Sequence, residues 1–256
     1  MMNDFKTLRV NETDEGRVLR VQLDRPDKGN ALSSRILSEL LQVLNHLEDD
    51  RTIRVMVLSG AGEHFCQGGD RSEFMALIEE DPSGGALHAY GDKAVRVCEA
   101  LERSKVMTIA RLHGDVIGAG IGLAVFCDLR VGAANCRFRM PEVALGLPPA
   151  WGGILDRLQA EAGQASVREL LLTADQFDAE RAKNMSILQK VVPLDDLDDS
   201  IVHWVKPALR RDPTAMRMTK DMLNARANAA RLSAGSFYEP ALLTGAYIRR
   251  QLARRR

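Results

Sequence analysis

Several features that mark particular classes of protein are scarce or missing in this sequence. Aromatic residues make up only 5% of its 256 residues, so the core must be built mainly from aliphatic side chains and methionine. Lys and Arg number 35, and Asp and Glu also number 35. The resulting zero net charge argues against a general nucleic-acid-binding surface. No apolar run approaches the about 18 residues of a membrane span, and residues 1–6 lack the apolar stretch of a secretion signal.

Cysteine is also sparse, with four residues at Cys66, Cys98, Cys127 and Cys136. They form no C-x-x-C pair and have no nearby histidine, so neither a zinc site nor a disulfide framework is indicated. The remaining composition, 45% hydrophobic and 27% charged, is ordinary for a soluble globular protein. We therefore expect a reduced, cytoplasmic protein without a metal ion, a membrane segment or a nucleic-acid partner.

Strand-like and helix-like patterns alternate through the first half of the chain. Short apolar runs that end at turn residues predict strands at 17–23, 53–58, 106–112 and 129–133. Ser33 or Ser34 can cap a helix whose apolar residues follow at helical spacing as far as Leu47. A second helix is predicted at 86–102. Strands separated by helices indicate an α/β sheet with crossover connections.

The last third of the chain has a mostly helical pattern. Helical spacing predicts helices at 167–173, 179–184, 201–209, 214–230 and 232–254, whereas only 188–192 looks extended. No internal repeat or Pro/Ser linker separates the two parts. We therefore expect an α/β core at 1–195 that continues into a helical region at 196–256.

Two glycine-rich segments, 62–70 and 113–122, each follow a predicted strand. Glycine lets the backbone approach a ligand closely, and a helix that begins there supplies free N–H groups. Two such donors aimed at one oxygen would form an oxyanion hole. The alternative is a pair of tight strand-to-helix turns packed for structural reasons. A dinucleotide site is weakly supported, because Leu123 stands at the third position of a G-x-G-x-x-G pattern.

Three side chains are candidates for acid/base chemistry. Glu142 lies beside an apolar run, where loss of solvent would raise its pKa toward a usable value, although a surface glutamate is the alternative. His88 and Tyr90 lie where a helix is expected to begin, and either one could supply a second acid/base. A solvated or core position is the alternative for both.

Four motifs in this order and spacing resemble the crotonase superfamily, also called the enoyl-CoA hydratase/isomerase family. They are RPDKGNAL at 25–32, FCQGGD at 65–70, the GAG segment at 118–120 that leads to Cys127 and Asp128, and MPE at 140–142 followed by two glycines at 152–153. The resemblance runs from about residue 8 to the C-terminus. It implies a spiral of ββα units with a C-terminal helical region that drives trimerisation, as a homotrimer or a dimer of trimers.

The resemblance also implies a lyase or isomerase that binds acyl-CoA, with coenzyme A as part of the substrate and no separate cofactor. The thioester carbonyl would be held by the backbone N–H groups of Gly69 and Ala119, with Glu142 as acid and base. The residues that match the family's adenine and pantetheine contacts are Lys28, Gly29, Ala31, Gln67, Gly68, Asp70 and Arg71. For Arg71, which could meet a phosphate, a solvated arginine is the alternative.

One departure from the family pattern bears on the reaction. Family hydratases use two glutamates, and the first of them falls on Gly122 here. Ordinary hydration of crotonyl-CoA is therefore disfavoured, whereas isomerisation of a 3-enoyl to a 2-enoyl thioester, or hydration with one glutamate, stays open. Trp151 could stack on a cyclic acyl group or pack against a helix.

Two further readings of the resemblance stay open as well. The acyl group could be presented on a carrier protein instead of CoA. Alternatively, the chain could be a catalytically idle binding protein on the same fold.

Overall fold

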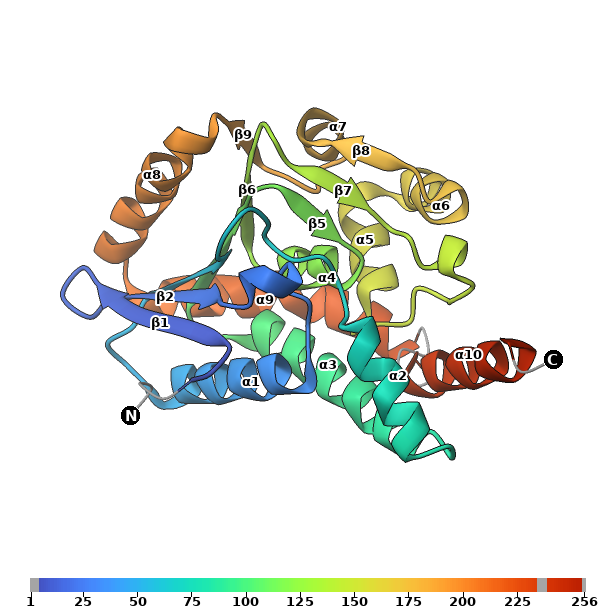
Figure 1. Ribbon diagram of the computed structural model, residues 1–256. Coiled ribbons are helices and arrows are strands. Elements are labelled where there is room, and N and C mark those ends of the chain that lie inside the picture. Colours follow the sequence, from blue (N-terminus) through green and yellow to red (C-terminus); the bar gives the residue numbers. More distant parts are fainter. Residues whose placement is uncertain (1–4, 234–238, 255–256) are drawn as a thin grey trace.

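Two β-sheets and the helices around them make up the computed structural model, which describes residues 5–233 and 239–254 (Figure 1). The strands are β1 (Leu8–Thr13), β2 (Val18–Leu23), β3 (Val55–Gly60), β4 (Met107–Leu112), β5 (Asp115–Ile117), β6 (Leu129–Ala133), β7 (Arg137–Arg139), β8 (Gln176–Asp178) and β9 (Lys190–Val192). The helices are α1 (Ser34–Asp49), α2 (Arg71–Glu80), α3 (Gly85–Arg103), α4 (Ala119–Val125), α5 (Ile154–Ala162), α6 (Gln164–Thr173), α7 (Ala179–Asn184), α8 (Leu197–Arg210), α9 (Pro213–Ser233) and α10 (Glu239–Arg254). Short 3-10 turns lie at Pro26–Lys28 (η1), Val143–Leu145 (η2) and Leu194–Asp196 (η3).

The larger sheet has the strand order β1-β2-β3-β4-β6-β9. β1 and β2 form an antiparallel pair, and every later pairing in this sheet is parallel. The smaller sheet, β5-β7-β8, begins three residues after β4 ends. Helix α8 packs on β3, β4 and β6, and Figure 1 shows α1 and α3 on the other side of the sheet. The α/β class predicted from the sequence is confirmed.

Local sequence explains the best-predicted elements. The Ser33 side chain accepts a hydrogen bond from the N–H of Ile36 and caps α1. The apolar residues of α1 recur at helical spacing, and its buried face consists of Ile36, Leu37, Glu39, Leu40, Val43, Leu44 and Leu47. β3 is apolar and buried on both faces, as expected of a central parallel strand.

Some elements differ from the sequence prediction. The strand expected at 53–58 is β3 at Val55–Gly60, because the Asp50 carboxylate accepts from the N–H groups of Thr52 and Ile53 and holds them in a turn. Helices α2 and α5 and the strands β1, β5, β7 and β8 were not expected from the patterns. Of the last predicted helix, 232–254, the first two residues belong to α9 and 239–254 form α10, whereas 234–238 lie outside the described residues.

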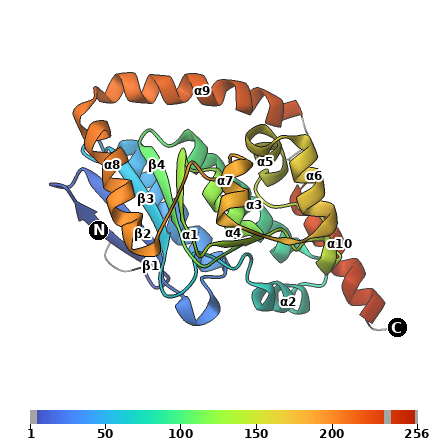
Figure 2. The same ribbon diagram turned by 90° about the horizontal axis from the view of Figure 1, so that it is seen from above.

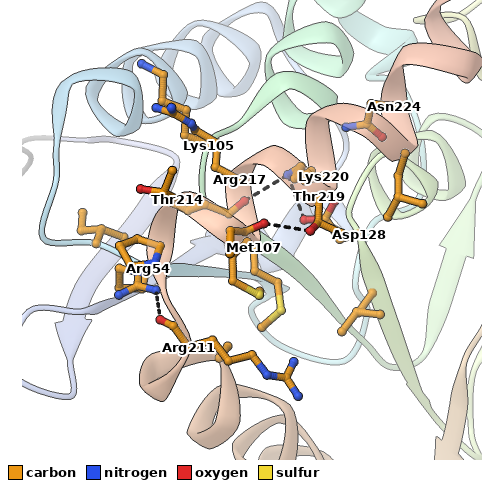
Figure 3. A pocket seen from close by; sticks show the side chains of 18 of the residues that line it. Arg54, Lys105, Met107, Asp128, Arg211, Thr214, Arg217, Thr219, Lys220 and Asn224 are labelled. Carbon is orange, nitrogen blue, oxygen red and sulfur yellow. Dashed lines mark hydrogen bonds and ion pairs between the residues drawn. The ribbon is translucent and has the colours of Figure 1, made fainter.

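Helices α9 and α10 extend over the core in different directions. α9 runs along one edge of the molecule (Figure 2). It is fastened by Lys220, whose Nζ donates to Asp128 Oδ2 at 2.8 Å and to the carbonyl of Val106 at 3.0 Å (Figure 3). α10 packs against α3, so closely that a Cβ on Gly84 would lie 2.4 Å from Cγ2 of Thr244. The C-terminal part is therefore helical, as predicted.

Candidate active site

The first glycine-rich segment ends in a turn with one N–H that faces away from its neighbouring strand. The Leu32 N–H donates to Gly68 O at 2.8 Å, and the Asp70 N–H donates to Leu32 O at 2.9 Å. Because successive residues of an extended segment point to opposite sides, the N–H of Gly69 is directed away from Leu32. A Cβ on Gly69 would lie 2.5 Å from Cζ of Phe74, so only glycine fits at this position.

The second glycine-rich segment contains the start of α4. Ala119 is the first residue of this helix, so its N–H has no carbonyl one turn earlier to bond with. Gly118 before it has φ 49° and ψ −115°, a conformation that residues with a Cβ rarely adopt. A bridge between Cys66 and Val116 joins the two segments, and a Cβ on Gly68 would lie 3.8 Å from the nitrogen of Ala119. The two turns therefore meet, as the predicted pair of donors requires.

Glu142 extends to the same place from the end of the smaller sheet. A Cβ on Gly118 would lie 2.7 Å from Oε1 of Glu142, so the carboxyl group lies against the start of α4. The residue as a whole is half-buried, but its Oε2 is fully buried and has no hydrogen-bond partner among the described residues. Burial raises the pKa of Glu142 from 4.5 to about 7. A carboxyl group with such a pKa can both take and return a proton near neutral pH.

Trp151 covers the position at which a second glutamate would stand. A Cβ on Gly122 would lie 2.7 Å from Cζ3 and 2.8 Å from Cε3 of Trp151, and 3.3 Å from Cδ1 of Ile154. The tryptophan is 8% exposed. Its ring thus packs against α4, one of the two roles considered for it, while stacking on an acyl group stays a prediction.

The two candidates for a second acid/base lie in different places. Tyr90 is buried, its hydroxyl donates to Leu32 O at 3.0 Å, and a Cβ on Gly69 would lie 3.6 Å from that hydroxyl. Burial raises the pKa of Tyr90 well above its usual value of 10. His88, two residues earlier on α3, has a 43% exposed ring that lies 3.7 Å from Asp92. The structure therefore brings Tyr90 to the two turns but leaves His88 at the surface.

The predicted CoA-contact segments lie against each other. The Gln67 N–H donates to Gly29 O at 2.9 Å, and the Gln67 side chain donates to Asp115 at 2.9 Å. Gly29 ends η1 in the left-handed conformation, with φ 56°. In the same turn Lys28 is exposed and Ala31 is half-buried. The structure brings these residues together, and their contacts with CoA stay a prediction.

Asp70 and Arg71 form the start of α2. One Asp70 oxygen accepts from Ser72 Oγ and from the Glu73 N–H, and the other accepts from Arg25 at 2.9 Å. Although burial raises the pKa of Asp70, the hydrogen bonds from Ser72 and Arg25 lower it below its usual value. The bond from the Glu73 N–H to the Asp70 carboxylate caps the start of α2. This cap helps to explain why a helix forms here although its apolar pattern is weak. Arg71 is exposed.

One residue of α10 near the site, Tyr247, was missed in the sequence. The Tyr247 ring lies edge-on to Phe74 with 5.5 Å between ring centres, and the Arg250 guanidinium donates to the carbonyl of Leu145 in η2. Burial raises the pKa of Tyr247, and the charges of Arg71 and Arg250 oppose that rise. A helical pattern alone carries no signal of which elements a helix covers.

A separate cavity of about 1200 Å³ lies beneath α9 (Figure 3). Its lining mixes cations such as Arg54 and Lys105 with acids such as Asp128 and Glu161. No residue predicted for the active site contributes to this lining.

In the part of the chain that the structure describes, no helix is long and apolar enough to cross a membrane. Among the same described residues, no group of three or more His, Cys, Asp or Glu side chains is placed to hold a metal ion.

Comparison with known proteins places this chain in a family. The sequence profile of the enoyl-CoA hydratase/isomerase family matches residues 13–247. A short-chain-enoyl-CoA hydratase of Clostridium acetobutylicum is 33% identical over 213 residues, which cover 82% of this chain and 78% of that protein. A peroxisomal Delta(3,5)-Delta(2,4)-dienoyl-CoA isomerase of Arabidopsis thaliana is 30% identical over 231 residues, covering 87% and 83% of the two chains.

A solved structure agrees with these sequence relatives. The crystal structure of an enoyl-CoA hydratase from Shewanella pealeana superposes with a TM-score of 0.81 at 27% identity and covers 88% of this chain and 82% of that chain. The profile, the relatives and the shared fold agree with the motifs described above. The chain therefore belongs to the enoyl-CoA hydratase/isomerase family of the crotonase superfamily and is an enzyme of that family, a lyase or an isomerase.

Proposed function

We propose that this protein acts on an acyl-CoA thioester through an enolate intermediate, with Glu142 as the one acid and base. The observation that carries the proposal is the buried Glu142 carboxyl group, whose pKa is raised to about 7. It lies against the turn that precedes the Ala119 N–H. The names of the relatives, which include enoyl-CoA hydratases and a dienoyl-CoA isomerase, support the substrate class.

In this proposal the thioester oxygen accepts hydrogen bonds from the N–H groups of Gly69 and Ala119. When Glu142 removes a proton from the carbon next to the thioester, negative charge collects on that oxygen. Donors that are held by a rigid backbone need no rearrangement at that moment. Removing one of them raises the activation barrier by about 3 kcal/mol. Glu142 then returns the proton to a carbon of the enolate.

The CoA moiety is proposed to lie along the two contacting segments, with Lys28, Gly29 and Ala31 on one and Gln67 and Gly68 on the other. Arg71, exposed at the start of α2, is suited to meet a phosphate. A carrier-bound acyl group would use the same carboxyl group and the same donors. A cytoplasmic location stays part of the proposal.

The C-terminal helices are proposed to assemble the protein as a trimer or a dimer of trimers. Met218 and Met222, four residues apart on α9, are 56% and 76% exposed, and Leu223 beside them is 72% exposed. Apolar side chains grouped on one helix favour association. Light scattering on purified protein should give three or six times the chain mass, and a monomer would contradict the assembly.

The substitution Glu142→Gln tests the reaction, because it keeps the shape of the side chain and removes the base. We expect turnover of enoyl-CoA thioesters to fall at least about 100-fold, while calorimetric binding of a saturated acyl-CoA is retained. Glu180→Gln, on an exposed glutamate of α7, is the matched control and should leave turnover unchanged. Near wild-type turnover in Glu142→Gln would sink the proposed role.

A further inference from the structure

Glu142 and Trp151 occupy neighbouring places along one face of α4. Gly118 directly precedes α4 and Gly122 lies in its first turn, where the Gly122 N–H donates to the Gly118 carbonyl at 3.2 Å. A Cβ on Gly118 would meet the Glu142 carboxyl group, and a Cβ on Gly122 would meet the six-membered ring of Trp151. The indole therefore fills the space one helical turn beyond the acid/base.

The Trp151 ring is held firmly in that place. The following residue, Gly152, has φ 65° and packs so tightly that a Cβ there would lie 2.5 Å from Sγ of Cys98. The Gly153 N–H donates to Glu239 of α10 at 2.7 Å. The two residues after Trp151 are thus fixed to other helices, and the indole itself is 8% exposed and packed against Gly122. Any side chain at 122 would therefore collide with a rigid ring.

An attacking water needs a space of its own and two or more polar partners. The benzo edge of an indole supplies neither, since it takes up volume and forms no hydrogen bond to water. Among the described side chains that a Cβ on Gly118 or Gly122 would meet, only the Glu142 carboxyl group can hydrogen-bond such a water.

We infer that Trp151 and Gly122 act as a specificity pair that keeps the attacking water out and directs the enolate to double-bond isomerisation. The inference rests on the proposed function and narrows its substrate to 3-enoyl and 2-enoyl thioesters. Glu142 removes a proton from Cα. The C–H electron pair then delocalises onto the thioester oxygen, which gives an enolate conjugated with the C3–C4 double bond. The protonated Glu142 then returns that proton to C4, leaving the double bond at C2–C3, with no other reactant consumed.

The test gives the site both a second carboxylate and the room for it. The double variant Gly122→Glu/Trp151→Ala is compared with Gly122→Gln/Trp151→Ala, which has the same shape without the charge. Each is incubated with 2-enoyl-CoA and 3-enoyl-CoA, and mass spectrometry measures the ratio of water adduct to shifted double bond. We expect the wild-type protein to give the shifted product. The Glu variant should raise the adduct ratio about 100-fold over the Gln control.

Thermal unfolding tests the packing independently. Gly122→Ala should lower the melting temperature strongly in the wild-type background and only slightly beside Trp151→Ala. If neither double variant folds, the series Trp151, Trp151→Phe and Trp151→Ala decides alone, because the adduct ratio should rise as the ring shrinks.

Each contrary result has a distinct meaning. Equal adduct ratios in the Glu and Gln variants, or a wild-type protein that adds water as readily as it shifts the double bond, would overturn the inference. An equal loss of melting temperature for Gly122→Ala in both backgrounds would overturn it too. A wild-type protein that converts no enoyl thioester would refute the proposed function instead, and the inference would fall with it.

Discussion

The buried carboxyl group of Glu142 should make the stability of this protein depend on pH in a way that Glu142→Gln removes. Burial raises the pKa of Glu142 from 4.5 to about 7 in the folded protein. Below pH 4.5 the group is protonated in both the folded and the unfolded state. Between pH 4.5 and 7 the unfolded chain releases the proton and the folded chain keeps it, so the free energy of unfolding falls as pH rises.

The size of the effect follows from the pKa change. A pKa rise of this extent contributes about 3 kcal/mol to the free energy of unfolding at low pH. The wild-type protein has lost this contribution once the pH exceeds about 7. The glutamine variant carries no titrating group at this position. Its free energy of unfolding minus that of the wild-type protein should therefore be about 3 kcal/mol higher at pH 8 than at pH 4.

Urea unfolding of both proteins at fixed protein concentration, from pH 4 to pH 8, measures this difference. Contributions from all other titrating groups cancel when the two proteins are compared at each pH. A difference that stays constant across the range would refute the reasoning, because it would mean that Glu142 ionises in the folded protein as it does in water.

Three further substitutions have defined outcomes. Tyr90→Phe removes one of the two donors to the Leu32 carbonyl, which keeps the N–H of Asp70. It should cost about 0.5–1.5 kcal/mol in urea unfolding and leave the pH profile of turnover unchanged; loss of one side of that profile would show that Tyr90 acts as an acid or base. His88→Ala removes a partly exposed ring and should leave kcat/KM unchanged in a steady-state assay, whereas a large fall would place His88 in the site. Lys220→Met removes the cation bonded to Asp128 and should lower the free energy of unfolding by about 2 kcal/mol; an unchanged value would mean that this pair does not fasten α9.

Local patterns were sufficient for elements whose signals are local. The cap at Ser33 and the apolar spacing after it defined α1 to within about two residues. Helix α2 was missed because its apolar pattern is weak and its start is marked by a single local cap, the bond from the Glu73 N–H to Asp70. The three-residue strands β5, β7 and β8 are too short to show periodicity, and their pairing fixes them.

The site was predictable in its parts and less so in its assembly. The patterns alone left the glycine-rich segments and Glu142 as separate candidates, and the family resemblance joined them. Their proximity depends on the bridge between Cys66 and Val116, which no local pattern encodes. Packing of Trp151 against a helix was one of its two expected roles, but Gly122 as the packing partner was not predicted because the two residues lie far apart in the chain. Only the fold shows that one fills the space that the other leaves.

The central claim is that one glutamate moves a proton on an acyl-CoA enolate. The most direct measurement incubates the wild-type protein and Glu142→Gln with 3-enoyl-CoA in deuterated water and reads the products by mass spectrometry. The account predicts a shifted double bond with no added water from the wild-type protein, with deuterium entering wherever Glu142 exchanges its proton with solvent between the two steps, and neither change from the variant. Deuterium incorporation by Glu142→Gln at the wild-type rate would contradict it.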